Sequence, residues 1–141
     1  MGKQKSFDFL DASKRHYSDA VFLYADARLA NAAQLFGFAA ECGVKALVEK
    51  LLNQPLPPNY YVHVNVLVNL LHTLQVSVNG RQGAKYLAMM GHFKAFGTWH
   101  TDHRYQSETQ IPLKKYMESW AVASEEVQNM LQQAQIDSVL R

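Results

Sequence analysis

The sequence has few of the features of a secreted or membrane-spanning protein. A single cysteine, Cys42, among 141 residues excludes an intramolecular disulfide and predicts a reducing compartment, the cytoplasm. The basic N-terminus leads into Asp8 and Asp11 rather than an apolar stretch, which argues against a signal peptide. The longest apolar region, residues 35–52, is interrupted by charged residues, so we expect a core helix and no contact with a membrane.

An excess of charge of one sign is also missing. The chain has 14 basic and 12 acidic residues, a net charge of +2, which permits contact with an anion but is far from a concentrated basic stripe. There is no glycine-rich phosphate loop, nucleophile elbow or paired-carboxylate hydrolase signature. Length and a hydrophobic content of 48% predict one globular domain over residues 1–141.

Apolar residues recur at helical spacing and predict an all-α fold, an up-and-down bundle of four to five helices. We expect helices over about residues 6–29, 31–53, 63–76, 82–96 and 112–135. In the third range, alternating valines also fit a strand, but its length and the neighbouring helices favour a helix.

Capping and turn-forming residues between these ranges predict where the helices begin and end. Asn31 is expected to be the N-cap of the second helix, three prolines after Asn53 to stop it, and Gly97 to be the C-cap of the fourth. Asn79-Gly80 is a turn signal, and the tail after Gln135 is expected to fray. The buried stripe of the first helix is expected at Leu10, Tyr17, Val21, Tyr24 and Ala27.

The second expected helix is rich in small residues, which let neighbouring helices approach closely and predict the centre of the bundle. Glu41 and Lys45 lie one turn apart, in the favourable order for an intrahelical ion pair. A structural ion pair is the simpler interpretation, but an exposed pair is less natural in so apolar a helix, and a half-buried Glu41 would need a cationic partner. Arg104 is a candidate, because a guanidinium holds a carboxylate or a phosphate through two hydrogen bonds.

Residues 97–111 form an aperiodic polar and aromatic loop of about fifteen residues, which is long for a compact bundle and therefore a candidate functional segment. Trp99 and Tyr105 either stack on a base or anchor the loop to the bundle, and anchoring is the favoured interpretation. His100 and His103 flank Asp102, but this spacing matches no standard zinc site, so neither a metal nor a cofactor is expected.

Together these segments resemble the HEPN family, small helical bundles found beside nucleotidyltransferases and in RNA-cleaving toxins. The matching pieces, in family order, are Tyr17–Ala20, Gly37–Leu47, His63 and Arg104–Tyr105. Each piece is short, but their order and the chain length extend the resemblance over most of the sequence. The resemblance implies a homodimer with a cleft shared between the subunits, and a nucleotidyltransferase as a candidate partner.

Catalytic members of that family carry an Arg followed a few residues later by a His, and are held to cleave RNA without a metal. The resemblance thus implies that Arg104 would stabilise negative charge developing on phosphorus. No histidine occurs between Arg104 and Ile111, however, whereas His100 and His103 precede the arginine and could replace the missing acid and base.

Three functions remain open at this point. The first is a non-catalytic or weakly active module that binds a nucleotide or RNA phosphate through a set of polar and aromatic residues: Arg104, Tyr105, His103, Trp99, Glu41 and Lys45. The second is a metal-independent endoribonuclease toxin in which Arg104 clamps the phosphate and His100 or His103 moves protons. The third is a scaffolding partner of a nucleotidyltransferase, with the loop in contact with protein. The missing downstream histidine favours the first.

Overall fold

A computed structural model describes residues 7–77 and 81–140, with the side chains of all of these except residues 71–77, 81 and 82. Within these ranges the α-helices are α1 (Phe9–Ala25), α2 (Leu29–Leu52), α3 (Val64–Ser77), α4 (Arg81–Ala88) and α5 (Leu113–Ile136). Short 3-10 helices lie between them: η1 (Pro58–Tyr60), η2 (Phe93–Thr98) and η3 (Thr101–Tyr105). The described residues contain no strand, so the all-α prediction is confirmed, and the valine-rich third range is helical.

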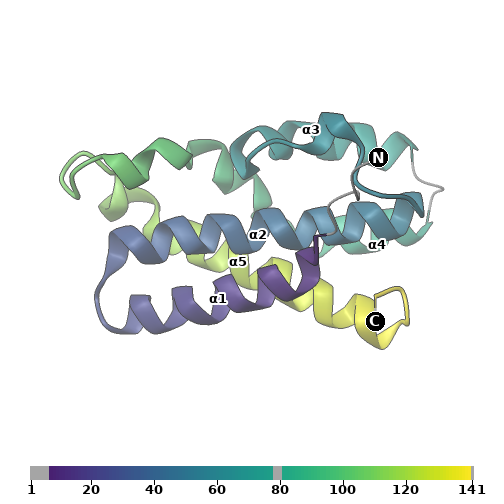
Figure 1. Cartoon of the computed structure of the whole chain (residues 1–141), viewed down its shortest axis with the longest axis horizontal. Helices are drawn as coiled ribbons and strands as arrows, with labels where there is room; N and C mark the ends of the chain where they lie inside the picture. The colour runs from purple at the N-terminus through teal and green to yellow at the C-terminus, as the bar shows by residue number, and fades with distance from the viewer. Residues whose placement is uncertain (1–6, 78–80, 141) are drawn as a thin grey trace, which may run out of the picture.

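Helix α2 is the centre of the bundle, as its small residues predict. Figure 1 shows it between α1 and α3, with α5 passing behind. A Cβ on Gly43 would lie 2.5 Å from Val127 of α5 and 3.0 Å from the Ser13 hydroxyl of α1, so both neighbours touch the glycine. The Ser13 hydroxyl also donates to the Ala39 carbonyl at 2.6 Å. Close approach therefore lets a buried serine bond to the backbone of α2.

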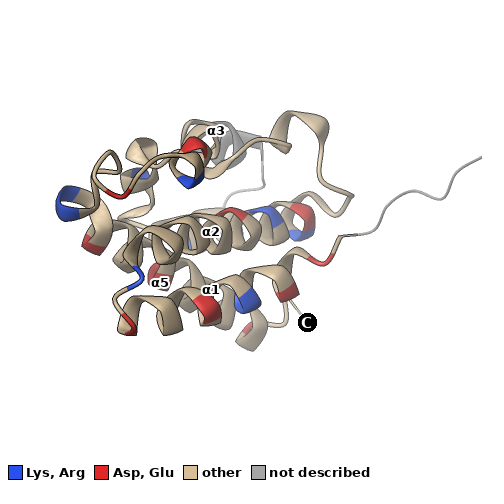
Figure 2. Cartoon of the chain, turned by 60° about the vertical axis from the view of Figure 1, so that its left-hand side comes forward, with Lys and Arg blue, Asp and Glu red and all other residues tan. Residues whose placement is uncertain are grey.

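The core is apolar and draws on α2, α3, α4, α5 and the segment around η2. The largest fully buried side chains are Trp99, Trp120, Tyr86, Phe36, Phe96, Leu47, Leu67, Met130, Leu131, Val44 and Val48. No helix in the described residues is long and apolar enough to cross a membrane. Figure 2 shows basic and acidic positions interspersed along α1 and α2, which agrees with the small net charge.

The prediction for the buried stripe of α1 is wrong in part. Leu10 and Tyr17 are half-buried, but Val21 is 44% and Tyr24 37% exposed, and Ala27 lies beyond the helix in an exposed turn. The fully buried positions of α1 are the small residues Ser13 and Ala20. Small side chains face α2 because the two backbones lie close together, and the larger residues are displaced to the edges of the contact.

Several helix ends also differ from the expected ones. Arg28 is the N-cap of α2, so Asn31 lies inside the first turn. Asn53 ends α2 in the left-handed conformation with φ 52°, and the prolines follow as expected. The fourth helix ends at Ala88, and Gly97 lies within η2 rather than at a cap. The predicted Asn79-Gly80 turn lies outside the described residues.

The C-terminal tail is tied down and not frayed up to Leu140. Asp137 accepts hydrogen bonds from Lys85 Nζ at 2.6 Å and from the Tyr86 hydroxyl at 2.7 Å. These bonds, the one from Lys85 foremost, hold the pKa of Asp137 at about 2, and burial raises the pKa of Tyr86 to about 12. Leu140 is 3% exposed and packs against the core. The tail thus joins α5 to α4.

Candidate functional site

The loop after η2 is fastened to the first half of α2 by Trp99. Its side chain is 1% exposed, and the indole Nε1 donates to the Ala33 carbonyl at 2.9 Å. The ring occupies the space beside Gly37, where a Cβ would lie 2.1 Å from the indole. Gln34 adds a second fastening through its amide, which donates to the His100 carbonyl at 3.0 Å. Trp99 is therefore an anchor and is too buried to stack on a ligand.

Helix η3 presents Arg104 and Tyr105 at the surface. The guanidinium carbon lies 4.7 Å from the centroid of the Tyr105 ring, a cation–π contact, and Tyr105 is 76% exposed. In the part of the chain that the structure describes, no carboxylate lies within ion-pair distance of Arg104. A planar guanidinium beside an aromatic ring offers donors for a phosphate and a face on which a base can stack.

The predicted pair between Arg104 and Glu41 is not formed. The loop docks beside Gln34, which lies two turns of α2 before Glu41, a rise of about 10 Å along the helix. The carboxylate of Glu41 has its own partners in α2 and at the start of α3. The two predicted site residues therefore belong to different parts of the molecule.

Glu41 is the centre of a polar cluster with buried Lys45 and exposed His63, whose side chain is 52% exposed. The predicted intrahelical pair between Glu41 and Lys45 is confirmed, and it is buried, with each residue 7% exposed. One carboxylate oxygen accepts from Lys45 Nζ at 3.2 Å. The other lies 3.0 Å from His63 Nδ1 and accepts from the Val64 backbone N–H at 2.9 Å, at the first residue of α3. The buried carboxylate thus joins α2 to the N-terminus of α3, where negative charge is favourable.

Sequence reasoning missed the role of His63, which entered only as part of the family resemblance. Two signals were present. A glutamate in an apolar helix needs partners, and His63 directly precedes the apolar run that becomes α3. The sequence does not tell how close His63 comes to Glu41, because that distance depends on the path of the chain from the prolines after α2 to the start of α3.

The two loop histidines have different environments. His103 is 9% exposed, and its ring centroid lies 5.8 Å from that of Trp120. Burial, followed by the nearby His100, lowers the pKa of His103, so its imidazole is neutral near pH 7. Its Nδ1 is buried and without a hydrogen-bond partner among the described residues. His100 is exposed, and its Nδ1 accepts from the Asp102 backbone N–H at 3.1 Å. Of these two candidate acid or base groups, only His100 faces solvent.

Comparisons of the chain with family models, curated proteins and solved structures found no match. Function is therefore inferred from the residues of this chain and their geometry.

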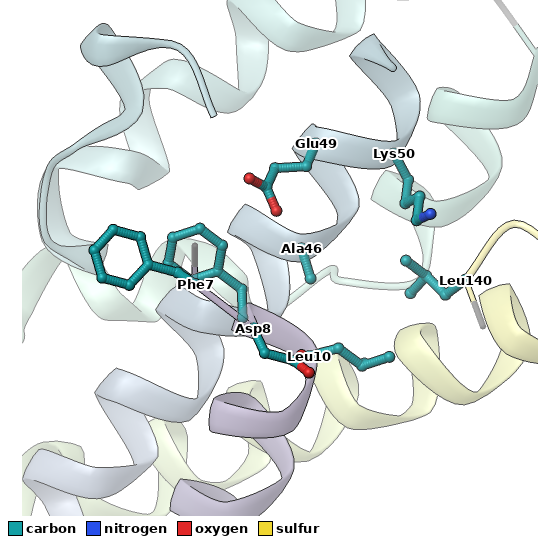
Figure 3. Close-up of a pocket in the computed structure, with 8 residues that line it drawn as sticks. Phe7, Asp8, Leu10, Ala46, Glu49, Lys50 and Leu140 are labelled. Carbon is teal, nitrogen blue, oxygen red and sulfur yellow. The ribbon is translucent and has the colours of Figure 1, made fainter. Parts of the chain in front are cut away.

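Three hollows in the described surface have Phe7 and Phe9, at the start of α1, in their lining. One of about 270 Å³ lies between α1, the last turns of α2 and the C-terminal tail. Figure 3 shows Glu49 and Lys50 on α2, with Leu140 of the tail just below Lys50. Another, of about 290 Å³, lies beside the Glu41 cluster and has Lys45 and His63 in its wall. The predicted site residues thus lie in two places. On the loop around η3, Arg104, Tyr105 and His100 are exposed and Trp99 and His103 are buried, whereas Glu41 and Lys45 are buried in α2 beside a hollow.

Proposed function

We propose that this chain is a HEPN-like module that binds a nucleotide or RNA phosphate through Arg104 and Tyr105 and does not cleave it. The observation that carries the proposal is the exposed guanidinium in contact with an exposed tyrosine ring, with no carboxylate partner in the described residues. A surface arginine without a counter-charge can exchange water for a phosphate at little cost. The neighbouring ring supplies a face for base stacking.

The loop is also positioned well enough to serve as a binding surface. Trp99 is held at its indole and Gln34 holds the carbonyl of His100, so the backbone leading into η3 is fixed before a ligand arrives. A surface that is ordered in advance loses less conformational entropy on binding. This ordering supports the binding role even though the loop lacks a strong positive field.

The local chemistry argues against efficient proton transfer. His103 is buried and its pKa is lowered, so it neither reaches solvent nor carries a proton to donate near neutral pH. His100 is exposed, and its Nδ1 lies 3.1 Å from the Asp102 backbone N–H and 3.4 Å from the Asp102 carboxylate. RNA cleavage needs a base for the 2′-hydroxyl and an acid for the leaving oxygen, and of the two loop histidines only His100 is exposed. General acid–base catalysis normally contributes about a hundredfold to ten-thousandfold, so its loss leaves a binding module.

The alternative is a metal-independent endoribonuclease, and exposed His100 is the one loop histidine of the two that could serve it. Incubation of the protein with a structured RNA in the presence of a chelator tests this. We expect no cleavage above that of an Arg104→Ala preparation. Robust cleavage by the wild type that is lost in both His100→Ala and Arg104→Ala would overturn the non-catalytic proposal.

The proposal includes a two-fold dimer with the η3 loops at a shared cleft. Exposed apolar side chains on α1 and α5 support it, with Phe22 at 73%, Val21 at 44% and Val122 at 38% exposure. Light scattering at micromolar concentration should give twice the chain mass for the wild type and the single mass for Phe22→Glu. A monomeric wild type would remove the shared cleft but leave binding by Arg104 within one chain open to the test below.

Binding is tested with a fluorescently labelled single-stranded RNA, measured by anisotropy at fixed low salt. Arg104→Ala should weaken binding roughly tenfold, because a charge-assisted hydrogen bond to phosphate is lost. Arg15→Ala is the matched control, because Arg15 is an exposed arginine on α1 with its side chain 62% exposed. Equal affinity for wild type and Arg104→Ala would contradict the proposal. The absence of any RNA or nucleotide binding would favour the scaffolding interpretation, with a nucleotidyltransferase as the partner to test.

A further inference from the structure

A second site of different chemistry lies beside the Glu41 cluster. The hollow there holds about 290 Å³ and is lined by Phe7, Phe9, Lys45, Tyr61, Val62 and His63. Its volume is near the lower end of the range of small-molecule pockets, about 300–1,000 Å³. It could hold a molecule of one or two rings but not a stretch of RNA.

The walls of the hollow are largely aromatic. Phe7 and Phe9 contact each other with ring centroids 5.8 Å apart, and Tyr61, the residue after η1, also lines the hollow and is 57% exposed. Val62 completes the apolar surface. Aromatic rings favour flat, apolar ligands through burial and offset stacking.

The polar part of the wall consists of a lysine and a histidine, with no carboxylate among the lining residues. Lys45 Nζ lies 5.9 Å from the centroid of the Phe9 ring. An ammonium has three N–H donors, and the recorded side-chain bond to Glu41 uses one of them. Glu41 bonds Lys45 through one oxygen and His63 through the other without lining the hollow, so it fixes both side chains from behind.

The two neighbouring hollows differ from this one because carboxylates are among their lining residues. The one in Figure 3 is lined by Asp8 and Glu49 as well as Lys50, and another of about 380 Å³ is lined by Asp8 and Asp11 with Arg15. Carboxylates in these walls repel an anion and offset the nearby cation. The hollow at Lys45 is the one of the three with no carboxylate in its lining, and Glu41, which pairs with Lys45, lies outside that lining.

We propose that this hollow binds a small aromatic carboxylate, with its ring between Phe9 and Tyr61 and its carboxylate on Lys45. A carboxylate suits this wall better than a phosphate dianion, because one ammonium already shared with Glu41 balances only part of a single negative charge. The site is separate from the proposed phosphate-binding surface on η3 and does not depend on it.

The test uses indole-3-carboxylate as the probe, with indole-3-carboxamide as its neutral counterpart and inorganic phosphate as the small anion. Binding to the full chain is measured by calorimetry or by chemical-shift changes in the protein. We expect the carboxylate to bind roughly tenfold more tightly than the amide, and phosphate not to displace it. Equal affinity of carboxylate and amide would overturn the proposal, as would displacement by phosphate at equal concentration.

Variants locate the site. Tyr61→Ala removes an exposed wall residue and Val62→Asp places a carboxylate in the wall, and each should weaken the probe tenfold or more. Tyr105→Ala is the matched control, because it removes an exposed tyrosine from η3 and should leave probe binding unchanged. Lys45→Gln should abolish the preference for the carboxylate if it folds; if it does not, the two wall variants decide. Unchanged probe binding in both wall variants would contradict the site.

Variants at the two sites should also have different effects on RNA binding and on probe binding. Tyr61→Ala should leave RNA affinity as in the wild type, whereas Arg104→Ala should leave probe binding as in the wild type. Failure of the probe alone would remove this pocket proposal, and failure of RNA binding alone would remove the proposed function.

Discussion

Two regions of the molecule have a cationic side chain beside an aromatic ring, but the cation is exposed in one region and buried in the other. On η3, Arg104 lies at the surface against the ring of exposed Tyr105, with no carboxylate partner in the described residues. In the middle of α2, Lys45 is buried near Phe9 and is paired with the equally buried Glu41. A surface cation keeps its hydration and is open to a ligand, whereas a buried one depends on its partner. Mutations at α2 should therefore have the larger effect on stability, and mutations at η3 the larger effect on RNA binding.

The largest expected effect is at the buried carboxylate. Glu41→Ala leaves Lys45 buried without its partner and the N–H of Val64 without its acceptor, so we expect a loss of about 3–5 kcal/mol in the free energy of unfolding. Urea denaturation followed by circular dichroism measures it. The double variant Glu41→Leu with Lys45→Met should recover much of the loss, because it removes both charges. A single-variant loss below about 1 kcal/mol would mean that the pair is solvated.

The next effect is at the loop anchor. Gly37→Ala places a Cβ 2.1 Å from the Trp99 indole, so the ring or the backbone must move, at a cost of about 1–3 kcal/mol. Gly97→Ala is the matched control, because a Cβ there meets nothing within 4 Å and should change stability by no more than about 0.5 kcal/mol. Thermal unfolding measures both. Equal melting temperatures for the two variants would contradict the docking of Trp99 on α2.

A smaller effect should appear in the pH dependence of stability. Burial lowers the pKa of His103 below that of an unfolded histidine, so the unfolded chain takes up a proton first as the pH falls. The protein should thus lose stability between pH 7 and the lower folded-state pKa, and keep it above pH 7. His103→Phe should reduce the difference between urea midpoints at pH 8 and pH 5. An unchanged difference would show that the imidazole is solvated.

The smallest effect on stability is expected at η3 itself. Arg104→Ala and Tyr105→Ala should each change the free energy of unfolding by no more than about 0.5 kcal/mol, because both side chains are exposed. A loss above about 2 kcal/mol in either variant, measured by the same urea titration, would show that the pair has a structural role and would erase the contrast with Glu41.

The fold was largely predictable because long helices carry many periodic positions. The faces of α2 and α5 agree with their apolar spacing, and the buried residues of α5 include Trp120, Ala123, Val127 and Leu131. Shorter elements were less predictable: η2 replaces the end of the expected fourth helix, since local propensity around Gly91 permits either structure. A terminal network at Asp137 cannot be read from spacing, because its partners lie about fifty residues away along the chain.

The sequence predicted which residues belong to the candidate site but not which of them contact one another. Arg104, Tyr105, Glu41 and Lys45 were each singled out, yet Arg104 was assigned to Glu41. The position at which the loop meets α2 depends on where Trp99 fits beside Gly37, a tertiary contact that spacing does not encode. His63 takes the place assigned to the arginine.

The central claim, that Arg104 contacts nucleic-acid phosphate, is tested most directly by the salt dependence of RNA affinity. The logarithm of the association constant for a single-stranded RNA should fall linearly with the logarithm of salt concentration, and the slope reports the number of neutralised phosphates. The slope should be shallower by about 0.7 for Arg104→Ala than for the wild type, because one phosphate contact is lost, and unchanged for Arg15→Ala. The same slope in all three proteins, or no RNA binding by the wild type, would contradict the claim.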